Sequence, residues 1–408
     1  MKILVLATTF PRWEKDTEPA FVYYLSKYLA QKNIEITVLV PHAYGAKKYE
    51  EIDNLKIYRF QYFWPARYQK LCYNGGALPN LKKSILAKIQ LPFFLLGQFL
   101  AIWNIVRRNK FDIIHSHWII PQGLFAVIMK ILYKIPVLLT AHAGDIFIAK
   151  SALLKSISKM IIEKSEMCTV NSIATDKAVK SVYSSANTCI VPMGVDLSLF
   201  SKEKREKKLR LDLGVEEDGV LILSVGRFAE KKGLIYLIEA VKYVIEKHKK
   251  VKLAIIGFGP EEENLKRLVQ DLTLNEYIEF LGKVPNSELP KYYASADIFV
   301  LPSIVDSRGD TEGLGVVLLE ALASGCAVIG SEVGGITDII RHRQTGLLTE
   351  QKNPNDLAKN INELIENTKL REELANGGHK HTIEMFSWDS VSEKFEEILY
   401  RIKQGLIP

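Results

Sequence analysis

Short apolar runs alternate along the whole chain with longer amphipathic segments. This alternation is typical of β-α-β units, which assemble into parallel sheets covered by helices. In residues 20–32, for example, apolar positions recur every three or four residues, which predicts a helix. Strands are expected at residues 2–8, 35–40, 55–60, 111–117, 136–142, 167–172, 220–226, 251–257, 278–282, 297–303 and 326–331. The sequence therefore predicts an α/β protein.

The alternation of predicted strands and helices is interrupted once, which indicates two domains. A chain of 408 residues is longer than one hydrophobic core usually serves. After residue 190 the apolar periodicity stops and charge becomes dense, and the next apolar strand begins at residue 220. We place the boundary near Asp196, which gives domains at 1–195 and 196–385. Residues 386–402 predict one amphipathic helix with no strand after it.

Composition narrows the class of protein. A hydrophobic fraction of 48% and a charged fraction of 25% are ordinary for a soluble globular chain and exclude a disordered or fibrous one. The amino-terminal apolar run is too short for a secretory signal. The four cysteines are far apart and form no CxxC pair, so we expect a reducing compartment and neither a disulfide scaffold nor a zinc module.

Charge is divided unevenly between the two halves. Residues 1–195 hold 25 Lys and Arg against 12 Asp and Glu, a net charge of +13, and the remainder carries −6. The apolar stretch 89–106 is too short and too interrupted to cross a bilayer, so we expect a buried or interfacial helix. No pattern indicates nucleic-acid binding, and we expect contact with an anionic membrane surface. An uneven but solvated surface is the alternative.

A glycine-rich segment carries two carboxylates. Glu320 is the only charge in the apolar run 315–325, and Glu312 precedes Gly313 and Gly315. A buried carboxylate is unfavourable unless it is hydrogen-bonded or protonated. A helix that begins near Gly315 would direct its free N–H groups at an anion. Sugar and ribose hydroxyls bind carboxylates and phosphates bind N–H donors, so this segment suits a sugar nucleotide; two solvated helical carboxylates are the alternative.

Two cations follow the strand at 220–226. Gly226 ends the strand, so Arg227 is expected at the carboxyl edge of a parallel sheet, where ligands of such sheets bind. Lys232 precedes Gly233 at a helix start. Together the guanidinium and the ammonium group can neutralise a diphosphate. The alternative is a pair of ordinary surface cations.

Three histidines end two neighbouring strands of the first half. His142 ends the apolar strand 136–142 and is expected to donate a hydrogen bond to a reacting sugar or to stabilise charge as the bond breaks. A core or capping histidine is the alternative. Asp145 can cap the following helix, and we interpret His115 and His117 as structural. We expect no metal site because no acidic third ligand lies nearby in the sequence.

The remaining glycine signals are weaker. The first loop, residues 8–21, is long and polar and lacks a GxGxxG pattern, which argues against an NAD enzyme. The GFGP sequence at 257–260 follows a strand, and we interpret it as the floor of a nucleotide crevice.

Four motifs together resemble the family 4 retaining glycosyltransferases, which have the GT-B fold of two facing Rossmann-like domains. They are GRFAEKKG, YASADIFVLPS, EGLGVVLLEALASGCAVIGSEVGGI and VPMGVDLSLF. EGLG in place of the commoner EGFG is similar to the branch with mannosyltransferases and exopolysaccharide transferases. Many members carry a glycine pair in the first loop, where this chain has TTFPRWEKD. The resemblance also implies that the segment 386–408 crosses back to the first domain.

The resemblance implies a role for each matched residue. Arg227 and Lys232 would hold the donor diphosphate, Glu312 the sugar and Glu320 the ribose, with His142 beside the sugar. Transfer would retain the anomeric configuration and require no metal or other cofactor. The implied catalytic residues are His142, Arg227, Lys232 and Glu312. The implied donor-binding residues are Gly226, Arg227, Lys232, Glu312, Gly313, Leu314, Gly315, Val316 and Glu320.

The expected substrates follow from the branch and the charge pattern. The donor would be GDP-mannose or, as a second choice, a UDP-hexose. We expect a lipid-linked glycan or glycolipid acceptor at the inner face of the cell membrane, with the enzyme cytoplasmic and peripherally bound. Two alternatives are a soluble GT-B enzyme with a small-sugar or glucan acceptor and a non-catalytic subunit that binds nucleotide sugars.

Overall fold

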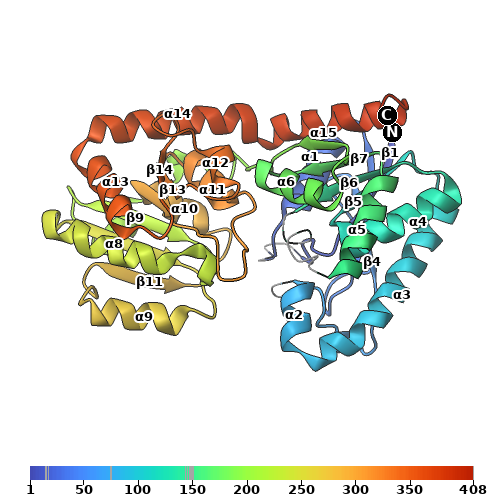
Figure 1. The fold of residues 1–408 in the computed structure, drawn as a ribbon, viewed down its shortest axis with the longest axis horizontal. Coiled ribbons are helices and arrows are strands. Elements are labelled where there is room, and N and C mark those ends of the chain that lie inside the picture. Colours follow the sequence, from blue (N-terminus) through green and yellow to red (C-terminus); the bar gives the residue numbers. More distant parts are fainter. Residues whose placement is uncertain are drawn as a thin grey trace. The chain divides into compact units, whose positions relative to one another are not determined.

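A computed structural model shows two compact units (Figure 1). Unit 1 comprises Met1–Pro192 and Val391–Pro408, and unit 2 comprises Met193–Ser390. The structure describes residues 1–13, 16, 18–73, 76–142, 144, 146 and 151–407. The chain thus passes into unit 2 after Pro192, where the sequence predicts residue 195, and returns at Val391, where it predicts residue 386.

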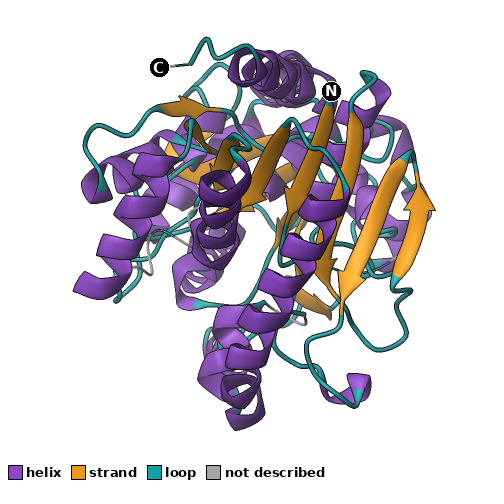
Figure 2. Cartoon of the chain, turned by 90° about the vertical axis from the view of Figure 1, so that its right-hand side faces the viewer, coloured by secondary structure: helices purple, strands orange, loops and turns teal. Residues whose placement is uncertain are grey.

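Unit 1 is built on an eight-stranded sheet in the order β3-β4-β2-β1-β5-β6-β7-β8, seen as a row of neighbouring strands in Figure 2. Its strands are β1 Lys2–Leu6, β2 Glu35–Pro41, β3 Tyr49–Ile52, β4 Leu55–Phe60, β5 Ile113–His117, β6 Val137–Ala141, β7 Met167–Val170 and β8 Thr188–Ile190. All neighbouring pairs are parallel except β3 and β4. The strand order reverses at β1, which lies between β2 and β5.

Unit 2 contains a six-stranded parallel sheet in the order β11-β10-β9-β12-β13-β14. Its strands are β9 Val220–Val225, β10 Val251–Ile256, β11 Ile278–Gly282, β12 Ile298–Leu301, β13 Ala327–Ser331 and β14 Leu347–Thr349. Here the strand order reverses at β9, which pairs with both β10 and β12. Ligands of open parallel sheets bind at the carboxyl ends of the strands beside such a reversal.

Helices connect the strands of each sheet and bury its two faces. Those of unit 1 are α1 Phe21–Gln31, α2 Ala77–Lys83, α3 Ile85–Arg108, α4 Leu124–Tyr133, α5 Ala152–Lys164 and α6 Ile173–Val182. Those of unit 2 are α7 Lys207–Asp212, α8 Leu234–Lys247, α9 Glu262–Asp271, α10 Leu289–Ser295, α11 Val316–Ala323, α12 Ile336–Ile339, α13 Pro354–Glu366 and α14 Thr368–Phe386. Strands such as β6 and β9 are buried along their whole length, so their sequences are mostly apolar instead of alternating between apolar and polar residues.

The helix predicted over 386–402 is α15 Trp388–Lys403, and no strand follows it in the described residues. It is separated at Ser387 from the preceding helix, α14. Trp388 packs so closely on Gly194 that a Cβ at Gly194 would lie 2.4 Å from the indole ring. Further along α15, Glu396 pairs with Lys32 at 3.5 Å and Lys403 pairs with Asp112 at 3.2 Å. The two ion pairs attach α15 to unit 1.

Candidate functional site

The loops after β9 and β12 meet at the strand reversal of unit 2. Gly226 follows β9 with a φ of 159°, and its N–H donates to the carbonyl oxygen of Ile256. A Cβ at Gly257 would lie 1.8 Å from the carbonyl oxygen of Gly226, so only glycine allows the loops after β9 and β10 to touch. The GFGP segment thus supports the backbone that carries Arg227. Its proposed contact with a nucleotide stays a prediction.

Arg227 is exposed on the loop after β9. Its neighbour Phe228 is fully buried and anchors the loop. The guanidinium of Arg227 has no ion-pair or hydrogen-bond partner within the described part of the chain. The side chain can therefore bind an external anion without first breaking an internal contact.

Lys232 is ion-paired with Glu312 across 80 residues of sequence. The Nζ–Oε2 distance is 2.6 Å, and the two side chains are only 14% and 13% exposed. The hydroxyl of Ser303, just after β12, also donates to Glu312, at 3.2 Å. Burial alone would raise the pKa of Glu312, but the charge and the hydrogen bond of Lys232 lower it overall. The pair is therefore ionised, with a carboxylate held beside the cation that the sequence assigns to a diphosphate.

The loop that carries Glu312 is fixed to the turn at Glu230–Lys232. Lys231 pairs with Asp310 at 3.1 Å, and the backbone N–H of Ser307 donates to Glu230 at 2.8 Å. On the other side, Gly335 donates to the carbonyl oxygen of Glu312 at 3.0 Å. A Cβ at Gly334 would lie 2.1 Å from that same oxygen. These contacts hold the Glu312 carboxylate in a defined position.

Helix α11 begins where the sequence predicts an anion-binding helix start. Gly315 precedes it with a φ of 90°, which disfavours residues with a side chain, and Val316 is its first residue. The first N–H groups of a helix have no acceptor within it and can bind an anion. The side chain of Leu314 is buried, so this residue and Gly313 can offer a ligand mainly backbone groups.

Glu320 lies one turn inside α11 and is hydrogen-bonded rather than isolated. The fully buried Tyr293 donates its hydroxyl proton to Oε2 at 2.7 Å. Burial raises the pKa of Glu320 to about 7, against the lowering effect of the tyrosine hydrogen bond. Near neutral pH both the ionised and the protonated forms are therefore populated.

His142 belongs to unit 1 and is joined to a second histidine. Its Nε2 lies 3.0 Å from Nδ1 of His117, and the two rings stack with centroids 5.2 Å apart. Phe21 and Trp118 each lie 4.9 Å from the His142 ring. Burial, with a smaller contribution from the charge of His115, lowers the pKa of His142 to about 3. The imidazole is neutral at physiological pH, and His117, which the sequence interpretation treats as structural, positions it. Asp145 lies outside the described residues.

Sequence comparisons agree with this topology and these motifs. A family model described as Glycosyltransferase Family 4 matches residues 20–199, and one described as Glycosyl transferases group 1 matches residues 205–381. An uncharacterized glycosyltransferase of Methanocaldococcus jannaschii is 30% identical over 320 residues, which cover 73% of this chain and 77% of the relative. This chain is a family 4 glycosyltransferase.

Two further similarities describe the enzyme's relatives. A GDP-mannose-dependent α-(1-6)-phosphatidylinositol monomannoside mannosyltransferase of Mycobacterium tuberculosis is 28% identical over 68% of this chain and 73% of its own. A sucrose-phosphate synthase structure from Thermosynechococcus elongatus superposes with a TM-score of 0.80 at 20% identity and covers 99% of both chains. The α/β GT-B fold predicted from the sequence is confirmed. The enzyme transfers a sugar from a nucleotide sugar.

The structure brings some of the predicted residues of this glycosyltransferase into contact. Lys232 and Glu312 form an ion pair, and the Lys232 side chain passes close to Gly226. Glu320 contacts Tyr293, and His142 is placed by its neighbours within unit 1. Residues that the sequence interpretation did not assign to the site are Ser303, Tyr293, His117, Gly334 and Gly335. The motifs YASADIFVLPS, HSHW and EVGGI contain all five.

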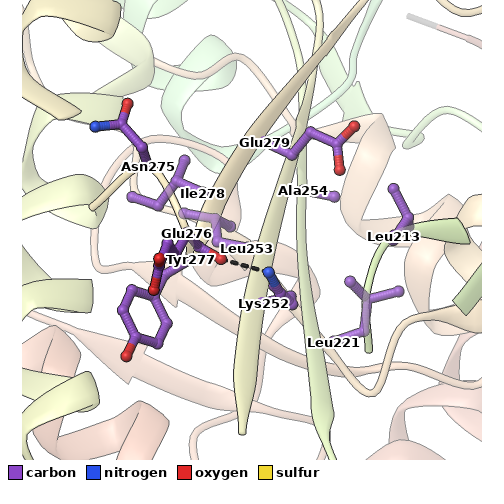
Figure 3. Close-up of a pocket in the computed structure, with 10 residues that line it drawn as sticks. All are labelled: Leu213, Leu221, Lys252, Leu253, Ala254, Asn275, Glu276, Tyr277, Ile278 and Glu279. Atoms are coloured by element: carbon purple, nitrogen blue, oxygen red, sulfur yellow. Dashed lines mark hydrogen bonds between the residues drawn. The ribbon is translucent and has the colours of Figure 1, made fainter. Parts of the chain in front are cut away.

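A small pocket of unit 2, shown in Figure 3, is lined by none of these residues. It has a volume of 140 Å³ and includes Leu221, Lys252 and Ile278, which lie at the amino ends of β9, β10 and β11. Lys252 donates to the carbonyl oxygen of Glu276 at its edge. The predicted donor residues follow the carboxyl ends of the strands, so this pocket is not the candidate site. The described residues include no group of three His, Cys, Asp or Glu arranged to hold a metal ion.

Proposed function

We propose that this enzyme transfers a hexose with retention to a lipid-linked glycan or glycolipid in cell-surface polysaccharide synthesis. The proposed donor is GDP-mannose, with a UDP-hexose as second choice. The observation that carries the proposal is the buried Lys232–Glu312 pair beside the unpaired guanidinium of Arg227 in the described part of the chain. This arrangement combines cations for a diphosphate with an acceptor for sugar hydroxyls.

In this proposal, catalysis depends on positioning and electrostatics. Arg227, Lys232 and the start of α11 stabilise the diphosphate as it leaves the sugar. Glu312 accepts a hydrogen bond from the sugar and Glu320 from the ribose, while His142 of unit 1 contacts the sugar as a neutral donor. No divalent metal is required, because fixed positive groups supply the charge that a metal would provide.

Two observations support the proposed acceptor: the name of a mycobacterial relative and the net charge of residues 1–195. The mycobacterial relative is named for a phosphatidylinositol monomannoside acceptor, which is a glycolipid. Residues 1–195 carry a net charge of +13, which favours an anionic surface. We therefore propose that the enzyme works at the inner face of the cell membrane as a peripheral protein.

A panel of nucleotide sugars tests the donor proposal. A ligand that binds only the folded state raises the melting temperature, equivalent to about 2.7 kcal/mol at a hundredfold excess over its Kd. We expect GDP-mannose to produce the largest shift and Lys232→Ala to abolish it. Lys250→Ala is the matched control, because it breaks ion pairs with Glu216 and Asp218 just before the amino end of β10, opposite the end that carries the candidate site. A panel in which no GDP or UDP sugar shifts the transition would refute the proposal, and transfer to free small sugars would refute the acceptor class.

A further inference from the structure

Helix α3 presents a continuous apolar face outside the protein core. Its exposed apolar side chains recur every three or four residues, from Ile85, which is 76% exposed, to Trp103, which is 39% exposed. We define the α3 stripe as Ile85, Ile89, Phe93, Leu96, Leu100 and Trp103. At the end of the neighbouring helix α4, Ile131, Leu132 and Tyr133 are exposed as well. An apolar surface of this extent on a soluble unit indicates an interaction site.

The opposite face of α3 is part of the unit 1 core. Phe94 and Ile102 are buried there, and the side chain of Gln90 accepts the backbone N–H of Lys70 at 3.0 Å. By length and composition alone, the 24 residues of α3 could cross a membrane. Doing so would remove this inner face from the core, so the packed helix can lie on a membrane but not span it.

Charges around the α3 stripe are almost entirely positive. Between residues 54 and 144 the sequence has twelve Lys and Arg and one acidic residue, Asp112; three of the twelve, Lys56, Arg59 and Lys130, are ion-paired with Glu35, Glu50 and Glu166 outside this range. Asp112 is neutralised by its ion pair with Lys403. Basic side chains occur on and beside α3 near both of its ends: Lys82, Lys83, Lys88, Arg107, Arg108 and Lys110. Anionic lipid headgroups would complement this pattern.

Two aromatic side chains join α3 to α4 at one end of the stripe. The indole N–H of Trp103 donates to the hydroxyl of Tyr133 at 2.7 Å, and the guanidinium of Arg107 lies 5.3 Å from the Trp103 ring centroid. Trp and Tyr are enriched where an apolar layer meets water, and basic residues bind the headgroups beside them. The three side chains therefore match the composition of a membrane interface.

We propose that the α3 stripe and the end of α4 form a membrane-docking surface that lies in the headgroup region of an anionic bilayer. A second copy of the chain is a less suitable occupant, because two stripes in either orientation would bring basic ends together. The membrane-docking surface is inferred independently of the proposed function. Only its role, which is to bring the enzyme to a lipid-linked acceptor, rests on that function.

Vesicle flotation without any nucleotide sugar tests the surface. The wild type should float with mixed phosphatidylcholine–phosphatidylglycerol vesicles at low salt and much less with phosphatidylcholine alone. Leu96→Glu combined with Leu100→Glu should reduce binding at least tenfold, and Arg107→Gln combined with Arg108→Gln should reduce it about 25-fold, since each basic residue contributes about fivefold. Leu211→Glu, at a similarly exposed apolar position on α7 of unit 2, is the matched control and should bind normally.

Three outcomes overturn the proposal. They are no flotation of the wild type with anionic vesicles, flotation of the Leu96/Leu100 variant equal to that of the control, and a lipid-free dimer that the same two substitutions dissociate. Circular dichroism confirms that each variant is folded. Donor-induced thermal shifts, measured in the same preparations without lipid, separate a failure of docking from a failure of the proposed donor binding.

Discussion

Glu320→Gln tests the environment of the buried carboxylate on α11. In the folded protein burial raises the pKa of Glu320 to about 7, from an ordinary value of 4.5. The folded state therefore holds the proton more tightly than the unfolded chain. The resulting stabilisation is fully present below pH 4.5 and is lost as pH rises through 7. The introduced glutamine cannot ionise but can still accept the Tyr293 hydrogen bond, so the variant should not lose stability over this range through this site.

The magnitude follows from the difference between the two pKa values. At about 1.36 kcal/mol for each pH unit, the complete loss in the wild type is about 3 kcal/mol. Between about pH 5 and about pH 8, linkage gives a loss of about 2.5 kcal/mol from this one group. The free energy of unfolding of Glu320→Gln minus that of the wild type should therefore increase by about 2.5 kcal/mol over the same interval.

Urea unfolding of the whole chain at several pH values measures this difference. Both proteins share every other titrating group, so those contributions cancel in the comparison. Glu332→Gln, which changes an exposed carboxylate of the same unit, is the matched control and should show no such trend. A difference between Glu320→Gln and the wild type that is constant with pH would refute the reasoning.

Three further outcomes are expected. Lys232→Ala should reduce the transfer rate by about 10²–10³-fold, because the leaving diphosphate loses a fixed cation, whereas Lys250→Ala, before the opposite end of β10, should retain most activity; equal losses in initial-rate assays would contradict the assignment. Gly257→Ala should lower the free energy of unfolding by about 1–3 kcal/mol, because its Cβ would meet the Gly226 carbonyl oxygen at 1.8 Å. An unchanged urea midpoint would argue against that contact. Transfer should continue in EDTA, and activity that returns only with magnesium or manganese would exclude metal-independent catalysis.

Local sequence patterns were sufficient to predict most strands but missed three of the four edge strands. Buried strands such as β6 and β9 are apolar except at Thr140 and Ser224, which makes them visible in a sequence. The strands that were missed are β3, β8 and β14, and each carries a weaker signal. β3 reads YEEI, lies on an exposed edge and pairs antiparallel, while β8 and β14 have three residues each. Pairing with a neighbour, rather than periodicity, defines these segments.

Contacts within the site were harder to predict than the residues that make them. Glycines and charges at strand ends make Arg227, Lys232 and Glu312 candidates, and the family motifs that contain them imply their roles. The pairing of Lys232 with Glu312 and of Glu320 with Tyr293 depends on which strands are neighbours in the folded sheet. The i, i+2 spacing of HSHW places His115 and His117 on one face of β5, but only the adjacency of β5 and β6 brings His117 to His142.

If Lys232 binds the donor diphosphate as proposed, the diphosphate must replace Glu312 as the partner of the Lys232 ammonium. The Lys232 ammonium is already neutralised by a carboxylate at 2.6 Å, and both groups are nearly buried. Glu312→Gln would leave that cation without a counterion, which is unfavourable by about 3–5 kcal/mol for a buried pair. A bound diphosphate would recover part of this energy, so GDP or UDP should bind about tenfold more tightly to the variant than to the wild type.

The transfer rate of Glu312→Gln should fall, whereas its affinity for GDP or UDP should rise. The amide of the Glu312→Gln variant is a poorer acceptor for sugar hydroxyls than a carboxylate, so we expect the transfer rate at saturating donor to fall while the affinity for the diphosphate product rises. Isothermal titration with GDP and UDP, together with initial rates on the same preparations, measures both quantities. Ser303→Ala, which removes only a hydrogen bond to Glu312 and leaves the ion pair intact, is the matched control. Weaker product binding to Glu312→Gln than to the wild type would show that Lys232 is not the group for which the carboxylate and the diphosphate compete.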